Sequence, residues 1–475
     1  MDSTGQSSEA RFVAYVESLT AALGHADRAQ PLMDYCTGLL MPGERKSVEP
    51  MAAVVAPKHV AAKHQSLLHF VGQAAWSDNA MLNRIRELVL PSIEANGEIE
   101  AWLVDDTSFV KKGVHSVGVA RQYCGRLGKT ENCQVAVTLS LANHAASLPV
   151  AYRLYLPEDW ADDQARRKKA HVPDDVTFKT KPQIALDQIA AMLASGAPKA
   201  IVLADAAYGC NGPFRAALTR MGLDYCVGVP SNTSVWPPGV EPLPAKARRG
   251  RGRKPSQAQH DSGHKPVLVK ALAKTLPASA WSEVTWREGS NTPLTSRFAA
   301  LRVRPAPRGD KGEANAPPEW LLMEWPEGEK EPAKYWLSTL PENTPLAVLV
   351  DKAKLRWPIE RDYEELKSEL GLADFEGRSW RGFHHHATLC IASYGFLIRE
   401  RAAFPPSAAS MPKEPAVSTG QRKRGSPCPA RTSRRKLNRD AAQKANDCSG
   451  KIIVSLPMLP AHYAKKGLPS TLVTQ

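Results

Sequence analysis

AWLVDD (residues 101–106) and AIVLAD (residues 200–205) are the two segments that decide the fold of this chain. Each is an apolar run of the length of a buried strand, and each ends in aspartate. Three further strand-like runs follow the first segment, and helical patterns lie on either side of the second. Strands in hairpin order followed by strands alternating with helices predict an α/β fold, a mixed sheet with helices packed on it.

The aspartates at the ends of these two runs are candidate catalytic residues. Sites in open α/β sheets form beyond the carboxyl ends of strands, so Asp105 and Asp205 are expected to meet there. Converging carboxylates can hold two divalent ions about 4 Å apart, the arrangement used to cleave phosphodiesters. For Asp205 alone, capping of a turn or helix is an equally good interpretation. Asp106 competes with Asp105, since a strand directs the two side chains to opposite faces; we favour Asp105, which directly ends the apolar run.

The third candidate is Glu360, in LRWPIERDYEELKSELG (residues 355–371). Proline suits a first helical turn, and the apolar spacings of four, three and four predict a packed helix with the stripe Ile359, Tyr363, Leu366 and Leu370. Glu360 and Lys367 fall on an adjoining face, where the glutamate could meet the metals while the lysine reaches a phosphate. Taken alone, Glu360 is more simply a solvated helix charge.

The pattern changes several times along the chain, which predicts five regions. A small helical domain, a candidate for binding DNA ends or for buttressing the rest, comes first. Next come the first part of the catalytic domain, a β-rich basic insertion and the part of the catalytic domain with the glutamate helix. The last region is a basic tail that cannot bury a core, and we expect it to be largely disordered. The boundaries are 1–95, 96–230, 231–340, 341–400 and 401–475.

The formal net charge of +14 is concentrated in two segments. Residues 245–311 contain 15 Lys and Arg against 4 Asp and Glu, and residues 401–475 contain 14 against 3. Each segment is therefore +11, and the remainder of the chain is −8. Positive charge concentrated in a few segments is typical of a protein that binds phosphates.

The eight cysteines form no CxxC pair and have no histidines at zinc-finger spacing, so we expect reduced thiols. The first residues lack the pattern of a signal peptide, and no apolar run approaches the roughly 18 residues of a membrane helix. We therefore expect no membrane association and a location in the bacterial cytoplasm. His384, His385 and His386 would point in different directions on a helix, which predicts a surface or phosphate-contacting position rather than a metal site.

In their order, these features resemble the ribonuclease-H-like catalytic domain of DDE transposases from bacterial insertion sequences, in the branch with a β-rich insertion before the glutamate helix. The resemblance covers about residues 30–400. The matching motifs are VDDTSFVKKG (104–113), VLADAAYG (202–209) and RWPIERDYEELK (356–367). In that branch the last signature is Tyr, Arg, Glu, Lys; Arg356, Glu360 and Lys367 fit its last three positions, and Ala353 stands at the tyrosine position.

The resemblance implies a transposase that cleaves the ends of an insertion sequence and joins them to target DNA. It implies that Asp105, Asp205 and Glu360 hold two Mg²⁺ ions, for which Mn²⁺ can substitute, since all-oxygen sites with few protein ligands suit these ions. Double-stranded DNA is the expected partner, and a homodimer on paired ends, associated with the nucleoid, is the expected assembly. The alternatives are a ribonuclease-H-like nuclease without strand transfer and a decayed transposase that acts as a DNA-binding repressor.

Several cations and one aromatic side chain are further candidates for DNA binding. Arg356 and Lys367 belong to the last signature, and two other groups lie in turns: Arg121, Arg126 and Lys129 in RQYCGRLGKTENC, and Arg378 and Arg381 in GRSWRG. Ordinary solvated turn charges are an equal alternative for both groups. Trp236 and other tryptophans of the insertion could stack on an unpaired base, although most of them are expected to form the core of the insertion.

Overall fold

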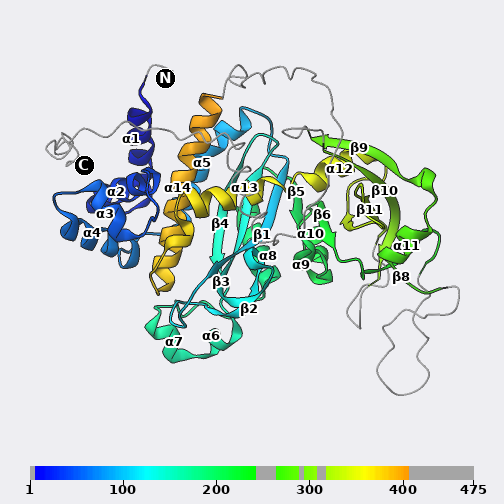
Figure 1. The fold of residues 1–475 in the computed structure, drawn as a ribbon, viewed down its shortest axis with the longest axis horizontal. Helices are drawn as coiled ribbons and strands as arrows, with labels where there is room; N and C mark the ends of the chain where they lie inside the picture. The colour runs from blue at the N-terminus through cyan, green and yellow to red at the C-terminus, as the bar shows by residue number, and fades with distance from the viewer. Residues whose placement is uncertain (1–5, 242–263, 288–293, 307–316, 406–475) are drawn as a thin grey trace, which may run out of the picture.

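The centre of the molecule is a mixed five-stranded sheet (Figure 1). The computed structural model describes residues 6–241, 264–287, 294–306 and 317–405. The five strands, in spatial order, are β4 (Ser147–Leu154), β3 (Lys129–Ala142), β1 (Ala101–Val110), β5 (Ile201–Ala204) and β6 (Tyr225–Val229). The first three are antiparallel to one another, whereas β5 is parallel to β1 and β6 to β5. This is the ribonuclease-H-like arrangement, so the predicted fold class is confirmed.

Alternate residues of the central strands enter two different cores. Trp102 and Val104 of β1 face the side covered by α5 (Asp78–Glu94), α8 (Lys181–Ala194) and α14 (Trp380–Ala403). Leu103 faces the opposite side, where it shares a core with residues of α12 (Leu346–Lys354) and α13 (Pro358–Glu364). Because strand side chains alternate, this division also decides where polar residues at the strand end point.

The predicted insertion is rich in strands, as expected, and it continues the central sheet. Its last strand pairs antiparallel with β6, with Leu337 opposite Val227, and the sheet reaches twelve strands (Figure 1). Its elements are β7 (Ser234–Trp236), β8 (Val267–Leu268), α11 (Val269–Thr275), η5 (Ala278–Ala280), β9 (Ser282–Arg287), β10 (Leu294–Pro305), β11 (Glu319–Trp325) and β12 (Lys334–Ser338). Much of the first basic segment and residues 406–475 of the tail lie outside the described residues.

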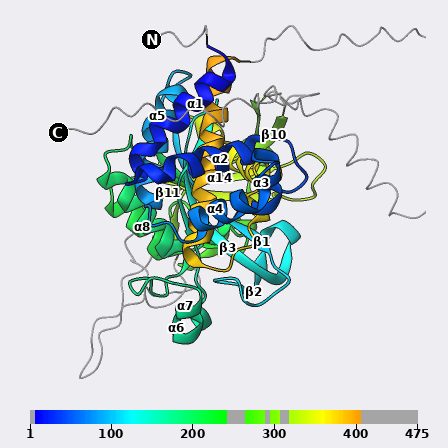
Figure 2. The same ribbon diagram turned by 90° about the vertical axis from the view of Figure 1, so that its left-hand side faces the viewer.

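The N-terminal helices pack around α14, so residues far apart in the chain share one core (Figure 2). The Tyr15 hydroxyl donates to the Ala392 carbonyl at 2.9 Å. The helices are α1 (Ser8–Leu19), η2 (Thr20–Ala22), η3 (Ala26–Arg28), α2 (Ala29–Leu40), α3 (Val48–Val55), α4 (Val60–Gly72) and α5. The helical prediction is confirmed, and the contacts are those of a buttress; binding of DNA ends by this region stays a prediction.

The helical segment after the insertion is divided into several shorter elements. α12 ends at Lys354, α13 begins at Pro358, and a π-helical turn, η6 (Glu365–Glu369), follows it. Proline fits the first turn of a new helix but not a helix interior, which explains the break. Arg356 therefore lies in the junction between two helices.

The remaining elements are short. They are β2 (Ala120–Cys124), η4 (Gly125–Leu127), α6 (Glu158–Asp162), α7 (Gln164–Lys169), α9 (Ala206–Gly209), α10 (Gly212–Arg220) and η7 (Leu372–Asp374). No helix among the described residues has the length and apolar character needed to cross a membrane.

Candidate active site

Asp105 and Asp205 occupy equivalent places on neighbouring parallel strands. The register pairs Val104 of β1 with Ala204 of β5, and each aspartate is the next residue along its chain. Adjacent strands lie about 4.8 Å apart, so the backbones of the two aspartates are neighbours. Asp105 and Asp205 each lie two residues after a leucine, Leu103 or Leu203, that enters the core beneath α12 and α13. Residues two apart in a strand face the same side. The two side chains are thereby directed to the same face of the sheet.

Asp106 points to the other face. Its carboxylate pairs with Lys181, at the start of α8, at 2.7 Å. It lines a small cavity of about 170 Å³ with Tyr155, Thr180 and Tyr208 among the other lining residues. The alternation of β1 thus separates Asp106 from the face that carries Asp205, which supports the choice of Asp105.

Asp205 also caps a helix, as one interpretation of the sequence predicted. Its Oδ1 accepts the backbone amides of Ala207 at 2.9 Å and Tyr208 at 3.4 Å, at the start of the four-residue helix α9. Among the described residues, no hydrogen bond ends on its Oδ2. The tight turn depends on glycine, because a Cβ at Gly209 would lie 1.9 Å from the Gly228 carbonyl oxygen. Capping fixes one carboxylate oxygen of Asp205 and leaves the other for a ligand.

Arg356 connects Asp105 to Glu360. Its Nη1 lies 2.8 Å from Asp105 Oδ2, and its Nη2 lies 4.0 Å from Glu360 Oε1. Burial lowers the pKa of the guanidinium, but the charges of Asp105, Asp205 and Glu360 outweigh burial and leave the pKa raised. All three candidate carboxylates therefore act on one arginine. Glu360 is 78% exposed, in the first turn of α13, and its side chain is open to solvent.

Burial changes the protonation of the first carboxylate. It raises the pKa of Asp105 to about 6; Arg356 opposes the rise and the charge of Asp205 adds to it. A carboxylate whose pKa is raised by burial and by a neighbouring carboxylate is typical of functional sites.

Two of the cations predicted to bind DNA lie beside this site. The Lys367 ammonium donates to the Ser108 carbonyl of β1 at 3.1 Å and lies over the ring of Phe109. Burial, together with the positive charge of Arg126, lowers the pKa of Lys367 to about 8. Arg126, in the β2–β3 turn, is exposed and its backbone amide approaches Ser108. The sequence suggested no connection between these two residues.

The other candidates for DNA binding are placed less uniformly. Arg121 and Lys129 are exposed on the same hairpin as Arg126, and Lys129 pairs with Glu131 at 3.4 Å. Arg378 is exposed, and Arg381 donates to the Gln73 carbonyl of the N-terminal helices at 2.9 Å. Trp236 is 4% exposed in β7, so we do not retain it as a base-stacking residue.

Two neighbours of Asp105 were not identified from the sequence as site residues. The Tyr363 hydroxyl shares a hydrogen bond with Thr138, the residue opposite Asp105 in the sheet. Tyr363 belonged to the predicted apolar stripe, in which Ile359, Leu366 and Leu370 are indeed buried. The contact with Thr138 on the neighbouring strand shows that the apolar stripe also supports the candidate site. The spacing of Tyr363 in the sequence could have indicated that its side chain faces the sheet, but not that it contacts Thr138.

The prediction that the three consecutive histidines lie at the surface is wrong. His384, His385 and His386 are all buried in α14. His385 stacks on Trp76 with ring centroids 3.6 Å apart, and His386 shares a hydrogen bond with the Tyr35 hydroxyl. Burial lowers the pKa of all three, which keeps them neutral. The N-terminal helices cover His385 and His386, and β4 contacts His384, whose ring accepts the Leu154 amide at 3.1 Å; neither contact could be placed from local sequence.

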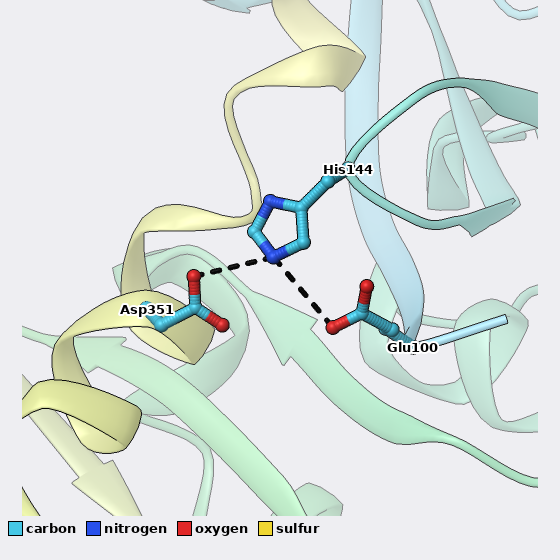
Figure 3. A group of neighbouring side chains, drawn as sticks. All are labelled: Glu100, His144 and Asp351. Carbon is cyan, nitrogen blue, oxygen red and sulfur yellow. Dashed lines mark ion pairs between the residues drawn. The ribbon is translucent and has the colours of Figure 1, made fainter. Parts of the chain in front are cut away.

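A second charged group lies at the opposite end of β1 (Figure 3). One ligand atom each from Glu100, His144 and Asp351 lies within 4.8 Å of the others, a spacing compatible with a metal ion. Among the described residues, this is the group of three in which the ligand atoms lie so close to one another. The ligand atoms of Asp105, Asp205 and Glu360, which lie around Arg356, are farther apart than this limit. Lys352, however, already pairs with both Glu100 and Asp351. These ion pairs account for the group without a metal.

Sequence comparison assigns the class of this fold and site. Residues 18–293 match the family described as DDE superfamily endonuclease, and because this span exceeds half of the chain, the protein belongs to that family. Asp105 and Asp205 lie within the matched span, and Glu360 lies beyond it.

One curated relative gives a closer comparison. The chain is 30% identical over 190 residues to the probable transposase for insertion sequence element IS701 from Microchaete diplosiphon. The match covers 40% of this chain and 46% of that protein, so the chain spans less than half of the relative's length.

Proposed function

We propose that this protein is a DNA transposase of an insertion sequence. The observation that carries the proposal is the placement of Asp105 and Asp205 at equivalent ends of neighbouring parallel strands, with Glu360 connected to them through Arg356. Membership of an endonuclease family and similarity to a probable transposase support it.

The residues present fit a pair of Mg²⁺ ions, or Mn²⁺ in their place. Asp105, Asp205 and Glu360 offer only oxygen ligands, which these ions prefer, and their charges exceed that of the one arginine they surround. When bound, the ions would activate the attacking oxygen and stabilise the leaving oxygen of the phosphodiester. We propose all three carboxylates as ligands, and the position of Asp106 on the other face, where it pairs with Lys181, supports Asp105 over Asp106.

The protein's cations would position the DNA. Lys367 and Arg126 lie together beside Ser108, close to Asp105, where they can bind phosphates on either side of the scissile bond. In the first step, water attacks the phosphorus and the 3′-oxygen leaves as a hydroxyl. In the second, that 3′-hydroxyl attacks a phosphodiester of the target, and a target 3′-hydroxyl leaves. No covalent intermediate with a protein side chain is required.

Two ends must be cut together, so we further propose a homodimer on paired ends, associated with the nucleoid when bound to DNA. In this arrangement Arg121, Lys129, Arg378 and Arg381 are candidates for contacts with DNA away from the cleaved bond. The N-terminal helices would support α14 and could contribute to end recognition.

The test uses the full chain and duplexes taken from the DNA that flanks the gene, with Mg²⁺ or Mn²⁺. Cleavage at the element's ends together with joined products is expected, and both should disappear in Asp205→Asn. Cleavage without joined products under either metal would indicate a nuclease without strand transfer. Binding without cleavage would indicate a DNA-binding repressor.

A further inference from the structure

Arg356 occupies the place where cations are needed in the proposed site. Its guanidinium contacts Asp105 at 2.8 Å and approaches Glu360 at 4.0 Å, and the charge of Asp205 also acts on it. Both side chains of the shorter pair are largely sheltered, with Arg356 27% and Asp105 15% exposed. The arginine is thus a resident counterion of the three carboxylates.

A divalent ion would compete with this arginine for the same oxygen atom. Asp105 Oδ2 accepts from Arg356, while Oδ1 accepts the backbone amide of Asp106 at 2.8 Å. A guanidinium remains charged in proteins, so the arginine cannot relieve the repulsion by losing a proton when a metal arrives. Arg356 must therefore move away when Asp105 takes a metal ion.

A DNA phosphate is the natural alternative partner for the displaced side chain. A guanidinium matches phosphate as well as carboxylate, with two parallel hydrogen bonds. Lys367 and Arg126 already form a positive region near Asp105, so a phosphate backbone bound there would pass close to the junction between α12 and α13 that carries Arg356.

We propose that Arg356 couples DNA binding to metal binding: it blocks Asp105 in the free protein and releases it when a DNA phosphate takes the guanidinium. This inference rests on the proposed function, because it assumes that Asp105 and Asp205 are metal ligands. Coupling between two ligands is reciprocal, so DNA would raise metal affinity by the factor by which metal raises DNA affinity. The protein would then load its metals efficiently only on DNA.

The experiment measures Mn²⁺ binding by electron paramagnetic resonance of the free ion, with the full chain and with or without a flanking-DNA duplex. His144→Ala serves as the background for every protein, because it removes one ligand of the second charged group at the far end of β1. Binding of Mn²⁺ to the duplex alone is subtracted, and gels check that the duplex stays intact. Arg356→Gln is the test variant. Arg361→Gln is its matched control, since Arg361 lies on α13 but pairs with Glu365 at 3.9 Å.

Without DNA, Arg356→Gln is expected to bind Mn²⁺ about tenfold more tightly than the parent, and Arg361→Gln is expected to match the parent. DNA should raise the parent's affinity about tenfold and that of Arg356→Gln by less than about twofold. Arg356→Lys, which keeps the charge, tests whether a change in folding explains the result: it should bind Mn²⁺ like the parent without DNA.

Equal or weaker Mn²⁺ binding by Arg356→Gln without DNA would overturn the inference, as would the same gain on adding DNA in Arg356→Gln and the parent. Failure of the proposed function has a different signature. If Asp105→Asn and Asp205→Asn leave Mn²⁺ binding unchanged in the presence of DNA, the assigned metal site itself is wrong.

Discussion

The two ends of β1 carry similar sets of charged groups but balance them differently. At the N-terminal end, the carboxylates of Glu100 and Asp351 both pair with Lys352, and both also contact His144 (Figure 3). At the C-terminal end, the charges of Asp105, Asp205 and Glu360 all act on Arg356. Among the described residues, Arg356 is the cation that forms ion pairs with Asp105 and Glu360. The two groups are separated by about 16 Å of strand, from the rise of about 3.3 Å per residue.

This difference teaches how to separate a structural cluster from a functional one. Both groups join β1 to the segment that contains α12 and α13, so both can hold the same elements together. In the first group both carboxylates already pair with the same lysine, Lys352, so ion pairs within the protein account for their closeness. In the second group three carboxylates share one arginine, Asp105 is largely buried, and an added cation would balance the excess of negative charge.

The largest expected effect is on catalysis. Asp205→Asn should lower the rate of DNA cleavage on the order of a thousandfold or more, because it removes a charge that stabilises the transition state through the metal. Asp351→Asn is the matched change at the other end, and it should leave the rate within about threefold of the parent's. Rates of cleavage of a flanking-DNA duplex measure both, and a similar loss in both variants would refute the distinction.

A smaller effect is expected on the pH dependence of stability. Because burial raises the pKa of Asp105 to about 6, the folded protein binds this proton more tightly than the unfolded chain does. The contribution of Asp105 to stability is therefore complete below about pH 4 and is lost as the pH rises through about 6. Asp105→Asn removes the loss, so from pH 4 to pH 7 its free energy of unfolding should rise relative to the parent's by up to about 3 kcal/mol.

Urea denaturation at several pH values measures this difference. Asp351→Asn, which leaves Lys352 and His144 with one partner fewer, is expected to gain no stability over the same range. A loss of stability in Asp105→Asn at pH 7 would mean that the ion pair with Arg356 outweighs the cost of burying the carboxylate.

A smaller change is expected in DNA affinity. It should follow only from substitutions near the C-terminal end of β1. Lys367→Ala is expected to weaken binding of duplexes of any sequence and to reduce the slope of log affinity against log salt concentration by about one, as for one lost phosphate contact. Lys352→Ala removes a lysine at the far end and should leave the slope unchanged. Titrations at a series of salt concentrations measure the slope, and equal slopes for Lys367→Ala and the parent would remove Lys367 from the DNA-binding surface.

The smallest effect is expected from breaking the balanced group itself. Glu100→Gln removes a partner of Lys352 and His144, all partly exposed, and should cost about 0.2–1 kcal/mol of the free energy of unfolding. Cleavage should be unaffected at a temperature where the protein is folded. A loss of activity without a loss of stability would show that this group positions the junction that carries Arg356 and the helix that carries Glu360.

Local sequence was sufficient for much of the fold and for the candidate residues. The short apolar runs AWLVDD and AIVLAD, and the aspartates at their ends, predicted the central strands and two of the three candidate carboxylates. Pro358 and the apolar stripe of residues 355–371 predicted a helix that presents Glu360. These features follow from short-range rules, namely the strand period of two and the helical period of 3.6.

Tertiary structure decided which of these residues can act together. It placed Asp105 on the face of Asp205 and Asp106 with Lys181, and it gave Arg356 a carboxylate partner. It also buried His385 and His386 beneath N-terminal helices some 300 residues away in the chain, and His384 against β4. It also paired β12 of the insertion with β6. Such contacts depend on sheet register and on packing between distant segments, and the residues near each side chain in sequence do not encode them.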